Sequence, residues 1–477
     1  MSDVLTISKY NDVYIHVDCE RSIAQELRDA FSFEVPGAKF HPKVRARVWD
    51  GKIRLFNTRN NLIYFGLLEQ VLRFAELRGY ESVVEDNINV NKNYSLSDAE
   101  EFGKTLNAPF DIRTYQTEAF AAGVRENRAL IISPTGSGKS FIIHMLLQYY
   151  KKKTLLVVPT TGLVEQMKGD LISYGTNPDF IHCIKDKDKR TNKPITITTW
   201  QAIFRMPKEF FEDFDVVIGD EAHQYKATSL VGIMEKLVNC KYRFGFTGSL
   251  DGSVTHEWVL QGLFGSIKQF TKTKDLIKEK HLSAFRIRCL LLNHRKEDCI
   301  KRDYPQEMDF LVSNNKRNKF ITKLVLSLKG NTLVLFQYVD KHGRVLYDQI
   351  KEKDPERDVE FIYGGVSGKD RNEIRINTES ADNSIIVASY GTFSTGINIR
   401  NLHNIVFASP SKSRIRNLQS IGRVLRLSDN EAEAVLYDIS DNLMCGKKKN
   451  YTLDHFGERL KLYISEEFDY KIYNIEL

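Results

Sequence analysis

No apolar run in the sequence approaches the roughly 18 residues that a membrane-spanning helix requires. Its 6 cysteines are scattered without a CxxC pair, which favours reduced thiols over a zinc site or a disulfide framework. The start, MSDVLTISKY, lacks the basic and then apolar layout of a secretory signal. Short-period repeats and low-complexity tracts are also absent. We therefore expect a cytoplasmic globular protein without a membrane partner.

The 477 residues are 42% hydrophobic and 27% charged, as in a globular protein of about two to four domains. A net charge of +7 permits a polyanionic partner. Polar stretches predict a small α+β domain that binds nucleic acid (1–95), a first lobe (96–292), and a second lobe with a helical C-terminal extension (293–477). In both lobes, apolar runs such as TLLVVP and SIIVAS alternate with helical patterns, which indicates an α/β fold with two tandem parallel sheets.

The stretch LIISPTGSGKS (130–140) joins an apolar strand to an apolar helix. It follows the P-loop pattern GxxxxGK[ST], with Ser133 in place of the first glycine. Backbone N–H groups and the helix N-terminus would converge there on a phosphate. Lys139 would reach the β- and γ-phosphates, and the Ser140 hydroxyl would bind Mg²⁺. We predict a nucleotide site formed by Pro134, Thr135, Gly136, Ser137, Gly138, Lys139 and Ser140, as in a transporter ATPase, a GTPase, a kinase or another nucleotide hydrolase.

Two acidic residues end a second apolar strand, in FDVVIGDEAHQY. After a buried strand in a chain with a P-loop, a metal-binding acid is expected at this place. We predict that Asp220 holds Mg²⁺ together with Ser140, and that Glu221 orients and deprotonates the attacking water.

A third motif, LQSIGRVLRLS, contains two arginines and a glutamine on a predicted helix. Arg423 and Arg426 are separated by three positions, so both guanidinium groups share one helix face. We predict that they neutralise charge on the transferring phosphoryl group, as arginine fingers do, and that Gln419 belongs to the same catalytic set.

A P-loop, Asp-Glu-Ala-His and Gln-x-x-Gly-Arg-x-x-Arg in this order resemble superfamily 2 helicases and translocases. The resemblance covers residues 110–440 and implies two tandem RecA-like lobes. It assigns nucleotide contacts to RTYQTEAF, with Arg113 and Gln116, and to Gly396. FTGSL, with Thr247 and Ser249, resembles the element that couples hydrolysis to strand movement. Expected nucleic-acid contacts are Pro159, Thr160, Thr161, Thr198, Thr199, Phe336, Ser389 and Thr395.

Within the superfamily, FSFEVPGAKFHPKVRARVWDGKIRLFN and the ending HFGERLKLYISEEFDYKIYNIEL resemble recombination and repair helicases of phages. That resemblance implies ATP- and Mg²⁺-dependent, 3′-to-5′ unwinding of branched DNA: forks, four-way junctions, D-loops and R-loops. It also implies recombination or single-strand-binding proteins as partners, in the host cytoplasm. Asn398 departs from the superfamily, since many relatives carry an aspartate there.

The run VRARVW-DG-KIRLF predicts a β-hairpin around Asp50-Gly51. A two-residue turn would place Val48, Ile53, Ala46 and Leu55 on a core face. The exposed face would carry Arg45, Arg47, Trp49, Lys52, Arg54 and Phe56. Like charges opposed across a ladder are destabilising, so we expect this basic face to bind phosphates, with the aromatic rings stacking on bases.

Three alternatives remain open from the sequence. RNA helicases share these motifs, so RNA could replace DNA as the substrate. A motor subunit of a restriction or defence complex would also fit, although no nuclease constellation is visible. A nucleic-acid binder that has lost hydrolysis is disfavoured by the intact Lys139, Asp220 and Glu221.

Overall fold

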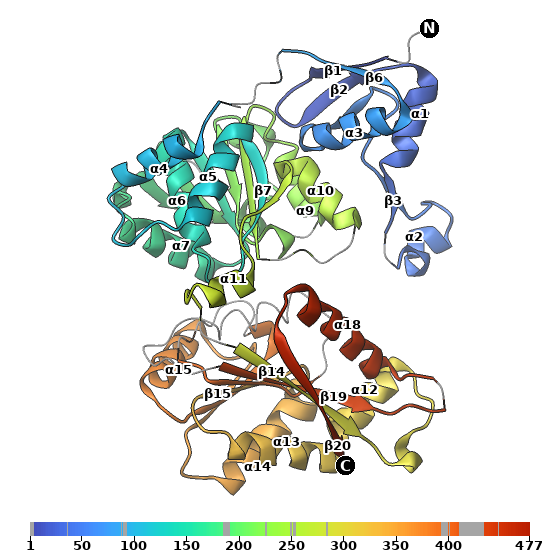
Figure 1. Cartoon of the computed structure of the whole chain (residues 1–477), viewed down its shortest axis with the longest axis vertical. Helices are drawn as coiled ribbons and strands as arrows, with labels where there is room; N and C mark the ends of the chain where they lie inside the picture. The colour runs from blue at the N-terminus through green and yellow to red at the C-terminus, as the bar shows by residue number, and fades with distance from the viewer. Residues whose placement is uncertain are drawn as a thin grey trace. The chain divides into compact units, whose positions relative to one another are not determined.

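The computed structural model describes most of the chain, and the excluded residues are 1–3, 36, 87, 89–92, 185–190, 225–226, 249, 251–253, 283–284, 393–398, 400, 410–433 and 447. The side chains of 227, 254–256, 368–369 and 371–372 are also outside the description. The chain divides into two compact units, residues 1–133 with 138–270 and residues 134–137 with 271–477 (Figure 1). None of the described helices is long and apolar enough to cross a membrane.

The first unit begins with a small α+β domain. Its four-stranded sheet has the order β5-β2-β1-β6, and β3 and β4 form a separate antiparallel pair. Alternating side chains of β1 and β2, such as Ile7 and Ile15, join Leu27 of α1 and Phe74 of α3 in one core. The elements are β1 (Val4–Lys9), β2 (Tyr14–Asp18), α1 (Arg21–Ala30), β3 (Ser32–Glu34), α2 (Pro42–Arg45), β4 (Lys52–Arg54), β5 (Leu62–Tyr64), α3 (Leu68–Arg78) and β6 (Glu81–Val84).

The predicted hairpin is wrong in this domain. Residues 42–45 form the helical turn α2, because Pro42 occupies its first position and His41 Nδ1 accepts a hydrogen bond from Lys43 N at 3.2 Å. The residues of β4 pair instead with β3, which places Glu34 opposite Lys52 and Phe33 opposite Ile53. This register opposes unlike charges, whereas the predicted hairpin would have opposed Arg47 to Arg54.

Because the hairpin does not form, its predicted core face and exposed face do not form either. Val48, expected in the core, is 76% exposed, and Ala46 is exposed as well. Phe56, expected to stack on bases, is only 2% exposed and belongs to the core, as does Leu55. The basic side chains therefore lie on a helical turn and a short strand rather than on one hairpin face.

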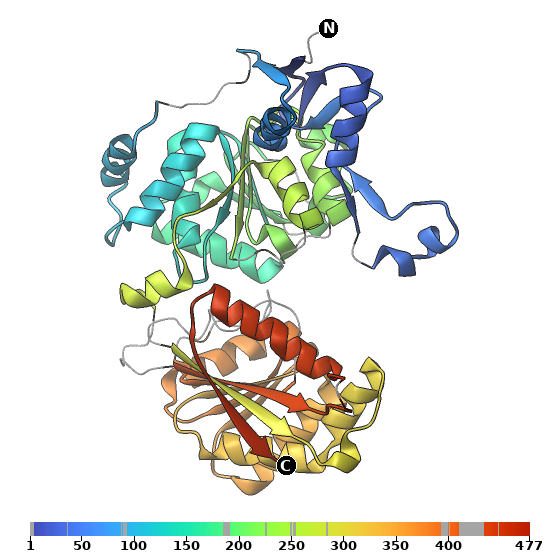
Figure 2. The ribbon, with the colours of Figure 1, turned by 45° about the vertical axis from the view of Figure 1, so that its right-hand side comes forward.

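The rest of the first unit is a lobe in which helices pack around a central sheet (Figure 2). The seven strands of this sheet are parallel and have the order β13-β7-β12-β11-β8-β10-β9. Its strands are β7 (Arg128–Ile132), β8 (Thr154–Val158), β9 (Ile181–Cys183), β10 (Ile195–Thr199), β11 (Val216–Gly219), β12 (Tyr242–Thr247) and β13 (Ile267–Gln269). Its helices are α4 (Leu96–Thr105), α5 (Thr114–Glu126), α6 (Lys139–Tyr150), α7 (Thr161–Ser173), α8 (Trp200–Ile203), α9 (Ala227–Met234) and α10 (Val254–Phe264).

The second unit holds another seven-stranded parallel sheet, of order β16-β17-β15-β18-β19-β14-β20. Its strands are β14 (Phe285–Asn293), β15 (Thr332–Phe336), β16 (Val359–Ile362), β17 (Ile385–Ser389), β18 (Asn404–Phe407), β19 (Ala434–Asn442) and β20 (Asp469–Glu476). Its helices are α11 (Thr273–Lys278), α12 (Tyr304–Ser313), α13 (Asn315–Ser327), α14 (Arg344–Lys353), α15 (Gly368–Ser380) and α18 (Tyr451–Ser465).

Two sheets of this kind confirm the predicted α/β class, but the predicted boundary at 292 and 293 needs correction. It would assign β14 to the first lobe, whereas β14 pairs along its whole length with β19 and β20 of the second sheet. The extension after β19 is also only partly helical, because α18 is followed by the edge strand β20.

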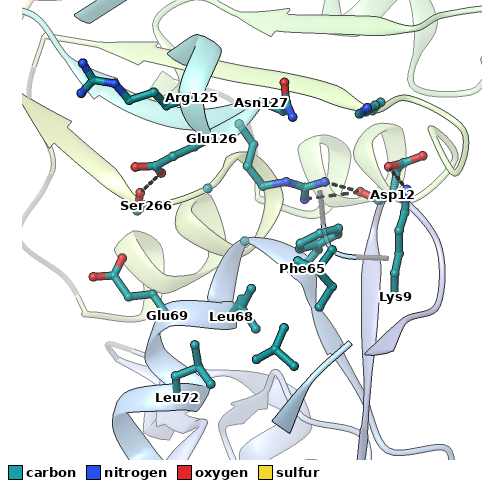
Figure 3. A pocket seen from close by; sticks show the side chains of 16 residues that line it. Lys9, Asp12, Phe65, Leu68, Glu69, Leu72, Arg125, Glu126, Asn127 and Ser266 are labelled. Carbon is teal, nitrogen blue, oxygen red and sulfur yellow. Dashed lines mark hydrogen bonds and ion pairs between the residues drawn. The ribbon is translucent and has the colours of Figure 1, made fainter. Parts of the chain in front are cut away.

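The small domain and the first lobe share one hydrophobic core. The hydroxyl groups of Tyr14 and Tyr64 both donate to Glu235 Oε1, at 2.7 and 2.8 Å. The Arg128 guanidinium donates to the Asp12 carbonyl at 3.4 Å and lies 3.6 Å from the centre of the Phe65 ring. A cavity of about 690 Å³ remains beside Asp12 and Phe65 (Figure 3). The two parts therefore form a single folded body.

We expect Glu235→Ala to lower the free energy of unfolding of the first unit by about 2 kcal/mol, because two buried hydroxyl groups lose a charged acceptor. Thermal and urea denaturation measure this loss. Glu209→Ala is the control, since Glu209 is exposed and has no ion pair within the described chain. Equal stability of both variants would show that the hydrogen bonds to Glu235 do not stabilise the interface between the small domain and the first lobe.

Candidate functional site

The predicted phosphate loop joins β7 to α6, as the sequence indicated. Gly136 and Gly138 have φ values of +84° and +78°, a backbone conformation that side chains oppose. A Cβ on Gly138 would also lie 2.4 Å from Gln116 Nε2. Inside the loop, the Ser137 hydroxyl donates to the Pro134 carbonyl at 2.6 Å. The loop therefore requires glycine at two left-handed positions, and it is stabilised by an internal hydrogen bond.

Lys139 and Glu221 form an ion pair, with Nζ 2.6 Å from Oε1. Glu221 has a φ of +48°, which is uncommon for a residue with a side chain. Its N–H donates to Asp220 Oδ1 at 2.9 Å, and the Asp220 N–H donates to the Val157 carbonyl. The structure therefore brings the phosphate-loop lysine and both predicted acids together at the ends of β7 and β11.

Burial and charge act differently on the two acids. Burial raises the pKa of Asp220 to about 6, although the Lys139 ammonium opposes the shift. Burial alone would also raise the pKa of Glu221, but Lys139 and His223 hold that pKa below its ordinary value. Burial thus opposes the charge on both acids, and the Lys139 ammonium favours their ionised forms.

His223 links this site to the end of β12. Its Nδ1 lies 2.6 Å from Thr247 Oγ1 and 3.5 Å from Glu221 Oε2. Thr247 is fully buried and its carbonyl accepts from the Ser133 N–H at 2.8 Å. The segment expected to couple hydrolysis to strand movement is thus hydrogen-bonded both to the acidic strand end and to the residue that opens the phosphate loop, while Ser249 lies outside the described residues.

The predicted adenine-reading segment lies at the start of α5. Gln116 is 3% exposed, and its Oε1 accepts from the Arg113 N–H at 3.1 Å. The Arg113 guanidinium donates to the Tyr115 hydroxyl at 2.6 Å. Because Gln116 also lies next to Gly138, this segment and the phosphate loop adjoin.

The residues expected to hold nucleic acid fall into two groups. Thr160 and Thr161 begin α7 and retain exposed surface. Pro159, Thr198, Thr199 and Ser389 are buried at strand ends. Phe336 is completely buried and stacks on Phe361 with ring centroids 5.5 Å apart, so its side chain packs in the core, and a nucleic-acid contact at this position stays a prediction. Gln419, Arg423, Arg426, Thr395, Gly396 and Asn398 lie outside the described residues.

Sequence patterns missed a buried ionic cluster in the second unit. Asp441 accepts from Arg317 Nε and His294 Nε2, both at 2.9 Å, and although burial opposes it, Arg317 and His294 hold the pKa of Asp441 at about 2. Arg317 also donates to the Ala408 carbonyl at 2.8 Å, and the Tyr390 hydroxyl donates to the Ser409 carbonyl at 2.9 Å. These contacts anchor the end of β18, immediately before the segment that contains the predicted arginine finger.

Arg28 of α1 was also missed, because its helix carries no motif. It lines a polar cavity of about 350 Å³ together with Lys52 and Arg54. No sequence pattern could indicate this, since Arg28 and Lys52 are 24 positions apart and line one cavity only because β4 pairs with β3, which follows α1.

Three family models match separate parts of the chain. Residues 5–85 match the model for the N-terminal part of the DNA helicase UvsW, residues 109–251 match the type III restriction enzyme res subunit, and residues 316–428 match the helicase conserved C-terminal domain.

Similarity to individual proteins extends further. The ATP-dependent DNA helicase uvsW of Enterobacteria phage T4 is 34% identical over 498 aligned residues, covering 97% of this chain and 98% of that protein. The crystal structure of T4 UvsW matches over 100% of both chains, with 31% identity and a TM-score of 0.53. A protein of Acanthamoeba polyphaga mimivirus named as an ATP-dependent RNA helicase is 24% identical, covering 72% of this chain and 67% of that protein.

The chain has two parallel-sheet lobes, a phosphate loop beside the Asp-Glu-Ala-His strand end, and matches to helicase models. These features define an ATP-dependent helicase of superfamily 2. The full-length similarity is more specific, and the chain belongs to the UvsW helicase family.

We expect Gly138→Ala to destabilise the first unit by about 1–2 kcal/mol and to weaken nucleotide binding, because a Cβ would strain the left-handed backbone and displace Gln116. Gly169→Ala is the matched control. It lies within α7 with open space around it and should stabilise the protein by about 0.5–1 kcal/mol. Thermal denaturation and equilibrium nucleotide binding distinguish the two, and wild-type nucleotide affinity in Gly138→Ala would contradict the described loop geometry.

Proposed function

We propose that this protein uses ATP hydrolysis to unwind or branch-migrate forks, four-way junctions, D-loops and R-loops. The observation that carries the proposal is the basic surface of the small domain, which shares a core with the first lobe. A DNA branch bound at that surface would be held by the same folded body that contains the ATP-hydrolysing lobe. The DNA helicase uvsW of phage T4, with its full-length similarity, supports DNA as the substrate.

For the nucleotide, we propose that Lys139 binds the β- and γ-phosphates while Ser140 and Asp220 hold Mg²⁺. Their hydroxyl and carboxylate oxygens are ligands that suit this ion. Within the described chain no three His, Cys, Asp or Glu side chains gather as a metal site, which fits an ion held largely by nucleotide phosphates. The bound ion would neutralise charge on the phosphates. Arg113, Gln116 and Gly396 remain proposed nucleotide contacts.

Glu221 is the proposed base that activates water. In the structure its carboxylate is paired with Lys139. Phosphates that attract Lys139 would release Glu221, so nucleotide binding itself would free the base. Arg423, Arg426 and Gln419 remain the proposed groups that stabilise charge in the transition state.

For the nucleic acid, we propose phosphate contacts by Arg45, Arg47 and Lys52, helped by Arg28 in the polar cavity. Arg45, Arg47 and Lys52 are exposed and have no ion pair within the described part of the chain, whereas Arg54 is paired with Asp50. Trp49 donates from Nε1 to the Lys52 carbonyl at 2.9 Å, which orients the loop between α2 and β4. Thr160 and Thr161 at the start of α7 are the proposed contacts to a single strand.

An RNA helicase is the second candidate function, favoured by the mimivirus protein whose name describes RNA as its substrate. Unwinding of matched DNA and RNA duplexes, beside forked, four-way, D-loop and R-loop substrates, separates the two. Faster unwinding of the RNA duplex than of any DNA substrate would overturn the DNA proposal.

We expect Lys139→Ala to abolish ATP hydrolysis and weaken ATP binding, because the loop loses its positive charge. Glu221→Gln should retain ATP and DNA while kcat falls by about 10²–10⁴-fold, since water activation is removed. Glu209→Gln, a change of the same type on an exposed acid of the same lobe, should keep normal kcat. Steady-state ATPase assays and nucleotide binding measure these effects. Normal hydrolysis by Glu221→Gln would show that another group is the base.

Arg45, Arg47 and Lys52, changed together to serine, should leave single-strand-stimulated ATPase largely intact but weaken binding to forks and junctions. Each lost phosphate contact should reduce the salt slope of binding by about 0.9. Binding isotherms at several salt concentrations and junction-migration assays give the result.

The matched control changes Lys104, Lys151 and Lys208 to serine. These lysines are exposed on the first lobe, and Lys151 has a φ of +47°, as Arg47 has +56°. The control removes the same charge, so it should keep the junction affinity and salt slope of the parent. Equal loss in both proteins would mean that net charge alone accounts for binding.

A further inference from the structure

A polar seam runs along the otherwise apolar helix α6. Six side chains of its first nine positions are buried and apolar or aromatic, but Ser140, His144 and Gln148 recur every four residues on one face. All three meet the turn that follows α7. The Ser140 and Tyr174 hydroxyl oxygens are 2.9 Å apart, and Thr176 Oγ1 lies 3.1 Å from His144 Nδ1 and 3.3 Å from Gln148 Nε2.

The Tyr174 ring is fixed from several sides. It contacts Phe110, Phe141 and His144 with centroid distances of 5.7, 5.2 and 5.6 Å, each at an edge-on angle. Burial lowers the pKa of His144 to about 4, so this ring is neutral at physiological pH and the seam carries no charge. A ring held in this way gives its hydroxyl a single position beside Ser140.

We infer that Tyr174 is a positioning residue for the Ser140 hydroxyl, and that it orients the Ser140 oxygen toward the metal ion of the nucleotide. This inference rests on the proposed role of Ser140 as a metal ligand. A serine hydroxyl has three staggered rotamers, and a hydrogen bond donated to Tyr174 selects one of them. In that rotamer the Ser140 hydroxyl proton points toward Tyr174, so a lone pair on Ser140 Oγ stays available for the ion.

The seam has a second consequence for α7. That helix begins at Thr160 and Thr161, the proposed strand contacts, and Tyr174 caps its other end. One helix thus lies beside the proposed metal ligand Ser140 at its C-terminal end and bears the proposed strand contacts on its first turn.

Tyr174→Phe in the full-length protein tests the inference, because it keeps the three ring contacts and removes only the hydroxyl. The readouts are the affinity for Mn²⁺ in the ADP complex, measured by electron paramagnetic resonance, and the Mg²⁺ concentration that half-saturates binding of a fluorescent ADP. We expect both affinities to fall about 10-fold, which is the effect typical of residues that orient a metal ligand.

Three further variants complete the experiment. Tyr150→Phe is the matched control, because the Tyr150 hydroxyl is buried in the same lobe without a hydrogen-bond partner within the described residues, and its loss should leave metal affinity unchanged. Thr176→Val breaks the other part of the seam, so it should lower the melting temperature without changing metal affinity. Ser140→Ala removes the proposed ligand itself and should weaken metal binding at least as much as Tyr174→Phe.

The outcomes separate the inference from the function on which it rests. Parental metal affinity in Tyr174→Phe, with weakened affinity in Ser140→Ala, would overturn the positioning role and leave the proposed metal site intact. Unchanged affinity in Ser140→Ala would overturn the metal assignment and the inference together. An equal loss in Thr176→Val and Tyr174→Phe would also overturn it, because general loosening of the seam would then explain the effect.

Discussion

The shared core of the small domain and the first lobe is the constraint on which the proposed function depends. Aromatic residues of the small domain, Phe31 and Phe33, both contact Trp258 of α10, with ring centroids 5.1 and 5.0 Å apart. Gly66 allows the two backbones to approach so closely that a Cβ there would lie 2.0 Å from the Gln261 carbonyl oxygen. A domain attached only by a linker could turn freely, but this one shares its core with the first lobe.

The nucleotide site holds three charged side chains close together. Each of Lys139, Asp220 and Glu221 would strongly destabilise the fold if it were buried without a partner of opposite charge. The ion pair between Lys139 and Glu221 lowers that cost. If Glu221 is the base, as proposed, the same ion pair must break before Glu221 can activate water.

Much of this architecture could be predicted from the sequence, because apolar strands and short motifs are local signals. The strands ending at Ile132 and Gly219 place the phosphate loop and the DEAH acids where the patterns indicated. The predicted hairpin failed because alternation cannot reveal that Pro42 starts a helical turn or that β4 pairs with β3. Proximity between distant positions has no local signal either, as the cavity shared by Arg28 and Lys52 and the contact between Ser140 and Tyr174 show.

The position of β20 determines when the second sheet can be completed during synthesis. β14 pairs with β19 and β20, and both of these strands begin more than a hundred residues further along the chain. The first unit has all its strands once Gln269 has left the ribosome, so it can fold while translation continues. β14 must wait with an apolar sequence, FRIRCLLLN, exposed to chaperones or to other nascent chains. A ribosome that stalls before β20 is made would thus leave a folded first unit attached to an incomplete and aggregation-prone second sheet.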